Sequence, residues 1–194
     1  LGREGGFAVE VAPGLQVDGQ ALSSARIRTL LAAGDVAAAR RLMATPFSLR
    51  GRVVHGAKRG RQLGFPTANL ALLDDYVVPG NGVYAVRCRV ETDDPMAPGQ
   101  ERNGGLERAG PWLNGAANIG IRPQFDAGER SIEVFLLDFD GDLYGRTVRV
   151  AFVERLRDEL RFADVEALVA RMGEDVAEAR RVLAKEVEAR SSWL

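Results

Sequence analysis

The stretch GFPTANL, residues 64–70, places a proline directly before a Thr-Ala-Asn-Leu run. Proline fixes its own φ angle and moves the residue before it toward an extended conformation, so this stretch predicts a β-strand. Side chains two residues apart on a strand point to the same face. We therefore expect Thr67 and Asn69 to present a hydroxyl and an amide oxygen side by side.

Other strand-like runs surround this stretch between residues 48 and 155. β-Branched and aromatic residues gather there in short runs separated by Gly, Pro, Asn or Asp, which is typical of strands and turns. No long helical segments alternate with these runs, so the sequence favours an antiparallel barrel or sandwich over a parallel α/β sheet. The polar, Pro- and Gly-rich residues 91–110 predict a long, mobile hairpin loop. The runs are SLRGRVVHG (48–56), GVYAVRCRV (82–90), WLNGAANIG (112–120), SIEVFLLDF (131–139) and RTVRVAFVERL (146–156).

Both ends of the chain are helical in pattern. Residues 164–189 carry apolar residues at helical spacing, and Asp164 is placed to cap them, while Gly173 is a possible break between two helices. Residues 1–47 predict a short strand and two helices, with Ser23 or Ser24 capping the first and Asp35 the second. This front segment is too small to form a core of its own.

The overall composition excludes several classes of function. The 194 residues suit one domain with extra material, and 26 basic against 27 acidic residues leave a net charge of −1, without the basic surplus of a nucleic-acid binder. The single cysteine, Cys88, allows no internal disulfide. No apolar run approaches the roughly 20 residues of a membrane span, and no signal peptide opens the chain. We expect a cytoplasmic protein without nucleic-acid or membrane partners.

Positive charge is nevertheless concentrated in one place. Five basic residues fall within twelve positions, with no acid among them, and they suit one phosphorylated ligand rather than a polymer. An ordinary solvated loop is the alternative. The five are Arg50, Arg52, Lys58, Arg59 and Arg61.

The same segment leads into the Thr-Ala-Asn strand. Neutral oxygens such as those of the Thr and Asn side chains suit Mg²⁺, which takes most of its ligand charge from substrate phosphates. Gly56, Gly60 and Gly64 would let backbone N–H groups approach a phosphate closely, with Lys58 and Arg61 adding charge. A turn with ordinary polar surface is the alternative. The chain has no Walker A string, so a kinase reaction here needs another architecture.

The strand SIEVFLLDF contains one acid, Glu133, on a face that it shares with Phe135, Leu137 and Phe139. A carboxylate among large apolar neighbours costs free energy unless a partner or a functional site holds it. Glu133 is therefore a candidate general base. The alternative is a glutamate near a strand end that simply reaches water.

The string DFDGDLYG, residues 138–145, has aspartates at three alternate positions, which is a pattern found in calcium-binding loops. The EF-hand pattern fails, because Leu143 occupies its glycine position and Arg149 its final glutamate position. Asp140–Gly141 between two strands predicts a hairpin turn instead.

In this order, the segments resemble the riboflavin kinase family, specifically the C-terminal kinase module of bifunctional bacterial FAD synthetases. The resemblance covers most of residues 48–185. It rests on GRVVHGAKRGRQLGFPTANL, NGVYAV, NIGIRPQF, IEVFLLDFDGDLYG and RLRDELRF. It implies a mainly β fold, a six-stranded antiparallel Greek-key barrel with a C-terminal helix and a short N-terminal helical remnant. It also implies transfer of the ATP γ-phosphoryl group to the 5′-hydroxyl of riboflavin, which yields FMN and ADP with Mg²⁺ as cofactor.

The resemblance assigns roles to individual residues. Thr67 and Asn69 match the family's metal and nucleotide ligands, and Glu133 matches the carboxylate that takes the proton. The remaining nucleotide-binding matches are Gly56, Lys58, Gly60, Arg61, Gly64 and Phe65, and the flavin-binding matches are Arg157, Phe162, Val165 and Glu166. Departures from the family pattern fall at Phe135, Ala163 and Gln124. A module that binds flavin or nucleotide without turnover is the alternative that these departures motivate.

Residues 16–47 resemble the end of the adenylyltransferase module that precedes the kinase in the bifunctional enzymes. LSSARIR stands where that family has Ser-Ser-Thr-x-Ile-Arg, and the His-x-Gly-His half is absent. The resemblance implies a remnant at 1–47, a kinase domain at 48–187 and a tail at 188–194. We expect no FAD synthesis from this chain, which resembles a fragment, and an adenylyltransferase module in the full-length protein.

Overall fold

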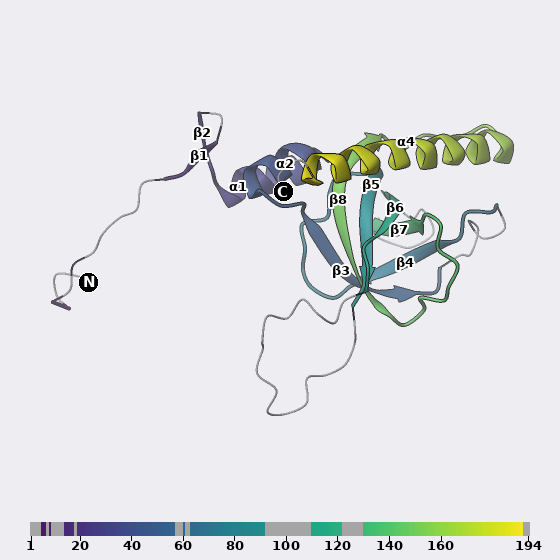
Figure 1. The fold of residues 1–194 in the computed structure, drawn as a ribbon, viewed down its shortest axis with the longest axis horizontal. Helices are drawn as coiled ribbons and strands as arrows, with labels where there is room; N and C mark the ends of the chain where they lie inside the picture. Colours follow the sequence, from purple (N-terminus) through teal and green to yellow (C-terminus); the bar gives the residue numbers. More distant parts are fainter. Residues whose placement is uncertain are drawn as a thin grey trace, which may run out of the picture.

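Six strands form a closed antiparallel barrel, and a long helix lies across it (Figure 1). The computed structural model describes residues 5–6, 8, 14–17, 19–56, 60, 63–91, 110–121 and 130–191. Around the barrel the order is β3-β4-β7-β6-β5-β8, which confirms the predicted fold class. The strands are β3 (Ser48–Val54), β4 (Thr67–Leu72), β5 (Gly82–Val90), β6 (Leu113–Ile121), β7 (Arg130–Leu136) and β8 (Thr147–Arg157).

The strand order corrects one local prediction. β7 pairs with β4 and β6, whereas β8 pairs with β3 and β5, so the Asp140–Gly141 segment joins two strands that are not neighbours. The predicted hairpin there is wrong, because a turn signal reports local bending and not which strands pair. The other predicted hairpin is confirmed by the β5–β6 pairing, which extends to Cys88 opposite Leu113. Residues 92–109 of that connection lie outside the described part of the chain.

The barrel interior holds most of the apolar core. Alternate residues of each strand point inward, and Tyr84 and Phe152 meet edge to face there with ring centroids 5.4 Å apart. The other face of β7 and its neighbours points outward. The barrel therefore offers an outer sheet surface that a helix can cover.

Helix α4 (Val165–Ser191) covers part of that surface. Asp164 caps it as predicted, since its Oδ1 accepts a hydrogen bond of 2.7 Å from the Ala167 N–H. The helix continues through Gly173, so the possible break there is wrong. A glycine inside a helix costs about 1 kcal/mol relative to alanine, and the packing of the following turns offsets that cost. That packing joins Ala179, Val182 and Leu183 to Ala85, Ala116 and Val153 of the barrel.

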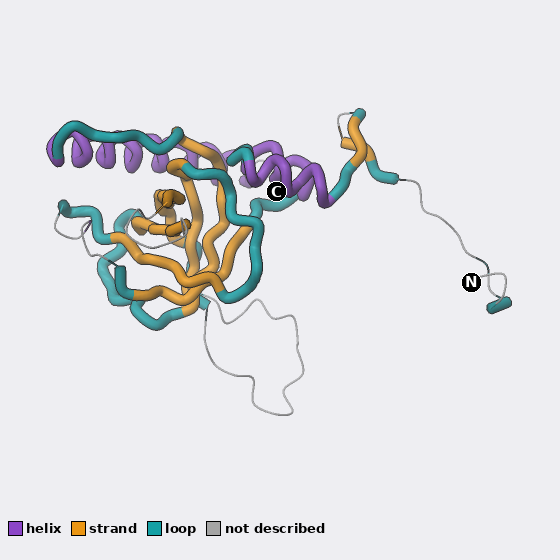
Figure 2. Tube along the Cα trace, turned by 180° about the vertical axis from the view of Figure 1, so that it is seen from behind, coloured by secondary structure: helices purple, strands orange, loops and turns teal. Residues whose placement is uncertain are grey.

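Two helices before the barrel, α1 (Ser24–Ala32) and α2 (Val36–Met43), pack onto it beside the far end of α4 (Figures 1 and 2). The predicted caps are confirmed: Ser23 accepts from the Arg26 N–H and Asp35 from the Ala38 N–H. Leu31, Val36 and Ala39 are fully buried and belong to the main core. The domain boundary at residue 47 stays a prediction.

An ion-pair cluster joins these helices to the barrel. Glu186 of α4 lies 3.0 Å from Arg40 of α2 and 3.0 Å from Arg87 of β5. The short pair β1 (Gln16–Val17) and β2 (Gln20–Ala21) lies away from the barrel (Figure 1). Within the described residues, no helix has the length and apolar character needed to cross a bilayer.

Candidate active site

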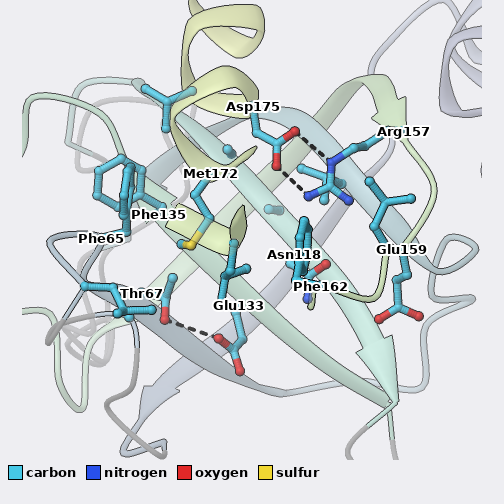
Figure 3. A pocket seen from close by; sticks show the side chains of 18 residues that line it. Phe65, Thr67, Asn118, Glu133, Phe135, Arg157, Glu159, Phe162, Met172 and Asp175 are labelled. Atoms are coloured by element: carbon cyan, nitrogen blue, oxygen red, sulfur yellow. Dashed lines mark hydrogen bonds and ion pairs between the residues drawn. The ribbon is translucent and has the colours of Figure 1, made fainter. Parts of the chain in front are cut away.

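The register of three neighbouring strands brings the predicted polar residues together. Asn69 of β4 and Asn118 of β6 each pair with Glu133 of the central strand β7. Paired residues on antiparallel strands share a face, and here it is the outer face of the barrel. The Thr67 hydroxyl donates a hydrogen bond of 3.2 Å to Oε2 of Glu133 (Figure 3). The hydroxyl, the amides and the carboxylate thus form one polar group.

A pocket of about 340 Å³ opens above this group, between the outer sheet surface and α4. Its walls carry the aromatic rings of Phe65, Phe135 and Phe162, and Phe65 meets Phe135 edge to face at 5.4 Å between centroids. Thr67 and Glu133 line the same pocket. The pocket therefore combines a surface suited to a flat aromatic ring with a polar group suited to hydroxyl chemistry.

A buried ion pair forms part of the wall. Arg157, at the end of β8, donates to both carboxylate oxygens of Asp175 in α4, at 2.7 and 2.6 Å (Figure 3). The Arg157 guanidinium also lies 6.0 Å from the centroid of the Phe162 ring. This pair fixes α4 against the barrel next to the pocket. The positive charge of Arg157 is matched by a protein carboxylate.

The predicted flavin-binding residues divide into two groups. Arg157 and Phe162 line the pocket. Val165 and Glu166 lie in the first turn of α4, exposed and outside the pocket lining, and Val165 keeps 54% of its surface accessible. The flavin-binding roles of all four stay predictions.

Gly56 and Gly60 lie against the Thr-Ala-Asn strand and the residues that lead into it. A Cβ atom on Gly56 would lie 2.2 Å from Nδ2 of Asn69, and one on Gly60 would lie 2.3 Å from the Phe65 carbonyl oxygen. Only glycine permits such close approach. Asn69 is consequently buried, with 5% of its surface accessible. Lys58 and Arg61 lie outside the described residues, so their predicted contribution is untested.

Arg50, the first residue of the predicted basic cluster, is held by an ion pair on the barrel. Arg50 donates from Nε to Glu91 over 2.7 Å, and Arg149 of β8 holds the other oxygen of the same carboxylate at 2.8 Å. Arg50 therefore serves a structural ion pair, and the phosphate site expected of the cluster stays a prediction. Sequence proximity alone does not show which way a strand residue such as Arg50 points.

A second pocket, of about 540 Å³, begins on the other side of Thr67. Val134 and Pro66 line it, as does the Phe139–Tyr144 turn. The ring of Tyr144 in this turn contacts the ring of His55, with the centroids 3.9 Å apart and the rings tilted by 35°. Thr67 lines both pockets, whereas Glu133 lines the first pocket only.

Several residues of the site were not predicted from the sequence. Asn118, Glu159, Met172 and Asp175 line the first pocket, but no spacing in the sequence connects them to Glu133. Asn118 becomes recognisable only once the β6–β7 register is known, and Asp175 only once α4 is docked.

Residues 43–183 match the family model described as riboflavin kinase (Flavokinase). The chain belongs to the riboflavin kinase family. Its sequence is 44% identical over 180 residues to the bifunctional riboflavin kinase/FMN adenylyltransferase of Pseudomonas fluorescens, covering 92% of this chain and 52% of the relative. It is 38% identical over 163 residues to the protein of the same description from Bacillus subtilis, covering 82% and 46%.

A solved structure extends this comparison to the fold. The structure described as a macrolide-efflux protein from Streptococcus pneumoniae superposes with a TM-score of 0.74 at 35% identity, covering 87% of this chain and 50% of that one. The chain thus spans about half the length of the relatives that it matches.

Proposed function

We propose that this chain is an ATP:riboflavin 5′-phosphotransferase that forms FMN and ADP. The observation that supports it most is the Glu133 carboxylate of the first pocket, held by Thr67, which lines both pockets. Phosphoryl transfer asks a protein mainly to position two substrates and to neutralise charge. A carboxylate in the first pocket, bonded to a hydroxyl that also lines a second pocket, suits that task.

Each pocket suits one substrate. The aromatic walls of the first pocket suit the isoalloxazine ring of riboflavin, whose ribityl chain would run toward Glu133. The second pocket, next to the His55–Tyr144 ring pair, suits the nucleotide. In this arrangement the γ-phosphate approaches from the Thr67 side and the 5′-hydroxyl from the Phe135 side. The two reacting groups then meet beside Thr67 of β4 and Glu133 of β7.

Glu133 acts as the general base. One of its oxygens accepts from Thr67, and the other is available for the 5′-hydroxyl proton. As that proton moves to the carboxylate, the 5′-oxygen bonds to the γ-phosphorus. The bond from this phosphorus to the β,γ-bridging oxygen breaks, and ADP leaves. A positioned base of this kind contributes roughly 10²–10⁴-fold to the rate.

The donor set near Glu133 fits Mg²⁺. Thr67 and Asn69 would hold the ion, because their neutral oxygens are hard ligands and the nucleotide phosphates supply the negative charge. The Thr67 proton points to Glu133, which leaves the lone pairs of its oxygen for a cation. When bound, Mg²⁺ neutralises charge on the phosphates.

The test is a direct assay of the chain with riboflavin, ATP and Mg²⁺, followed by chromatography of flavins and nucleotides. We expect FMN and ADP in equal amounts, with FAD monitored in the same run. Quenching of flavin fluorescence without any ADP would contradict the kinase proposal and favour the non-catalytic binding module.

A further inference from the structure

Asn118 differs from the other polar side chains of the first pocket in its hydrogen bonding. Six polar side chains line this pocket, and within the described residues five of them are engaged with a protein partner. Thr67 bonds Glu133, Arg157 bonds Asp175, and Glu159 accepts 2.9 Å from Asn81. Asn118 alone lines the pocket without a protein partner among these residues.

Asn118 is also the pocket residue placed directly opposite the base. It pairs with Glu133 across β6 and β7 and shares its face, so the two Cβ atoms lie about 4.5–5.5 Å apart. Ala116, its pocket-lining neighbour on the same face of β6, has a small side chain, whereas the Glu159 carboxylate lies over Gly120 on the other side. A ligand that reaches Glu133 can therefore also reach the Asn118 amide.

We propose that Asn118 determines specificity by hydrogen-bonding the substrate hydroxyl next to the one that Glu133 deprotonates. This inference rests on the proposed function and goes further, because it assigns the ribityl 4′-hydroxyl to a named residue. Hydroxyl oxygens on adjacent carbons lie closer together than the two Cβ atoms, so converging side chains can hold one each. Asn118 thereby fixes which hydroxyl of the chain faces the base.

The chemistry of the amide suits this task. An asparagine both donates and accepts, so it can bond a neutral hydroxyl in either orientation. It adds no second negative charge beside Glu133 or the incoming phosphate, whereas an aspartate would. We therefore expect Asn118→Asp to turn over riboflavin more slowly than Asn118→Ala, despite its similar shape.

The experiment pairs a change in the protein with a change in the substrate. Turnover of riboflavin and of 4′-deoxyriboflavin, which keeps the 5′-hydroxyl, is measured for the wild type and Asn118→Ala. One neutral hydrogen bond contributes about 0.5–1.5 kcal/mol, so each single change should lower kcat/KM roughly 2- to 10-fold. Asn118→Ala assayed with 4′-deoxyriboflavin should lose no more kcat/KM than either single change, because both changes remove the same hydrogen bond. Asn114→Ala, on the same strand but outside the pocket lining, is the control and should keep the full preference for riboflavin.

The possible failures are distinguishable. If the wild type forms FMN but Asn118→Ala keeps the full preference for riboflavin over the deoxy analogue, the assignment of Asn118 is wrong and the kinase proposal stands. If the wild type forms no FMN from riboflavin, both proposals fail.

Discussion

The Thr67 hydroxyl donates a hydrogen bond to Oε2 of Glu133 across 3.2 Å, although 66 positions separate the two residues. The pairing of β4 with β7 creates this contact; Glu133 lines the first pocket, and Thr67 lines both. In the proposed reaction, the bond orients the carboxylate toward one substrate and the hydroxyl oxygen toward the other.

Glu133→Gln should lower kcat for FMN formation roughly 10²–10⁴-fold, because the amide cannot accept the 5′-hydroxyl proton. The KM for riboflavin should change little, since the aromatic walls are intact. Steady-state kinetics measures both parameters. Glu154→Gln, an exposed residue of β8, is the control. Turnover near the wild-type rate in Glu133→Gln would show that the base is misassigned.

Thr67→Val removes the hydroxyl but keeps the side-chain shape, and Thr67→Ser keeps the hydroxyl. Hydrogen bonds and ligands to charged groups contribute about 1.5–3 kcal/mol, so we expect Thr67→Val to weaken Mg²⁺–nucleotide binding by roughly 10-fold or more. Titration calorimetry with ADP and Mg²⁺ compares the variants, and Thr67→Ser should retain most of the affinity. Equal affinities for both variants would argue against a role for this hydroxyl.

The local part of this site could be predicted from the sequence, whereas its assembly could not. The Pro-Thr-Ala-Asn run places Thr67 and Asn69 on one strand face, because alternation along a strand is a local property. The helix caps at Ser23, Asp35 and Asp164 follow from local hydrogen bonding in the same way. These local expectations agree with the structure.

Long-range pairing escaped the same reasoning. That β7 lies between β4 and β6, with Asn118 opposite Glu133, depends on strand register between distant segments. For the same reason Asp140–Gly141 was wrongly predicted to be a hairpin, and the ion pair of Arg50 with Glu91 was not foreseen. The Arg157–Asp175 contact likewise requires the docked position of α4.

Asp175→Ala should destabilise the protein strongly. The carboxylate and Arg157 are both largely buried, with 7% and 13% of their side chains exposed. Removing one partner of a buried pair costs about 3–5 kcal/mol, since the other charge is left uncompensated. Urea unfolding measures the loss. Glu174→Ala, which breaks an exposed pair with Arg171 on the same helix, is the control, and its free energy of unfolding should change by about 0.5 kcal/mol or less. Equal losses would contradict the importance of the buried pair.

The Glu91 cluster should make stability sensitive to acid. Burial disfavours the charged carboxylate, but hydrogen bonds from Arg50 and Arg149 outweigh burial, so the pKa of Glu91 lies below its ordinary value. A lowered pKa in the folded state stabilises the protein above the unfolded-state pKa, and this contribution is lost as pH falls through the folded-state pKa. The wild type should therefore exceed Glu91→Gln in unfolding free energy at pH 7 and approach it in acid. A constant difference from pH 7 to pH 3 would contradict this.

Cys88 should resist thiol reagents in the native protein. It lies in the barrel core with 2% of its surface accessible, and burial raises its pKa to about 12. The reactive thiolate is then scarce at pH 8. Mass spectrometry after iodoacetamide treatment should show no adduct on the folded chain and one adduct after denaturation. Rapid labelling of the native protein would contradict the buried position.

The most direct measurement is a crystal structure of this chain with riboflavin, Mg²⁺ and a non-hydrolysable ATP analogue. We expect the flavin ring between Phe65, Phe135 and Phe162, with the 5′-oxygen within hydrogen-bonding distance of Glu133 and the terminal phosphate on the Thr67 side. A 5′-oxygen bonded to another residue, with Glu133 turned to solvent, would contradict it.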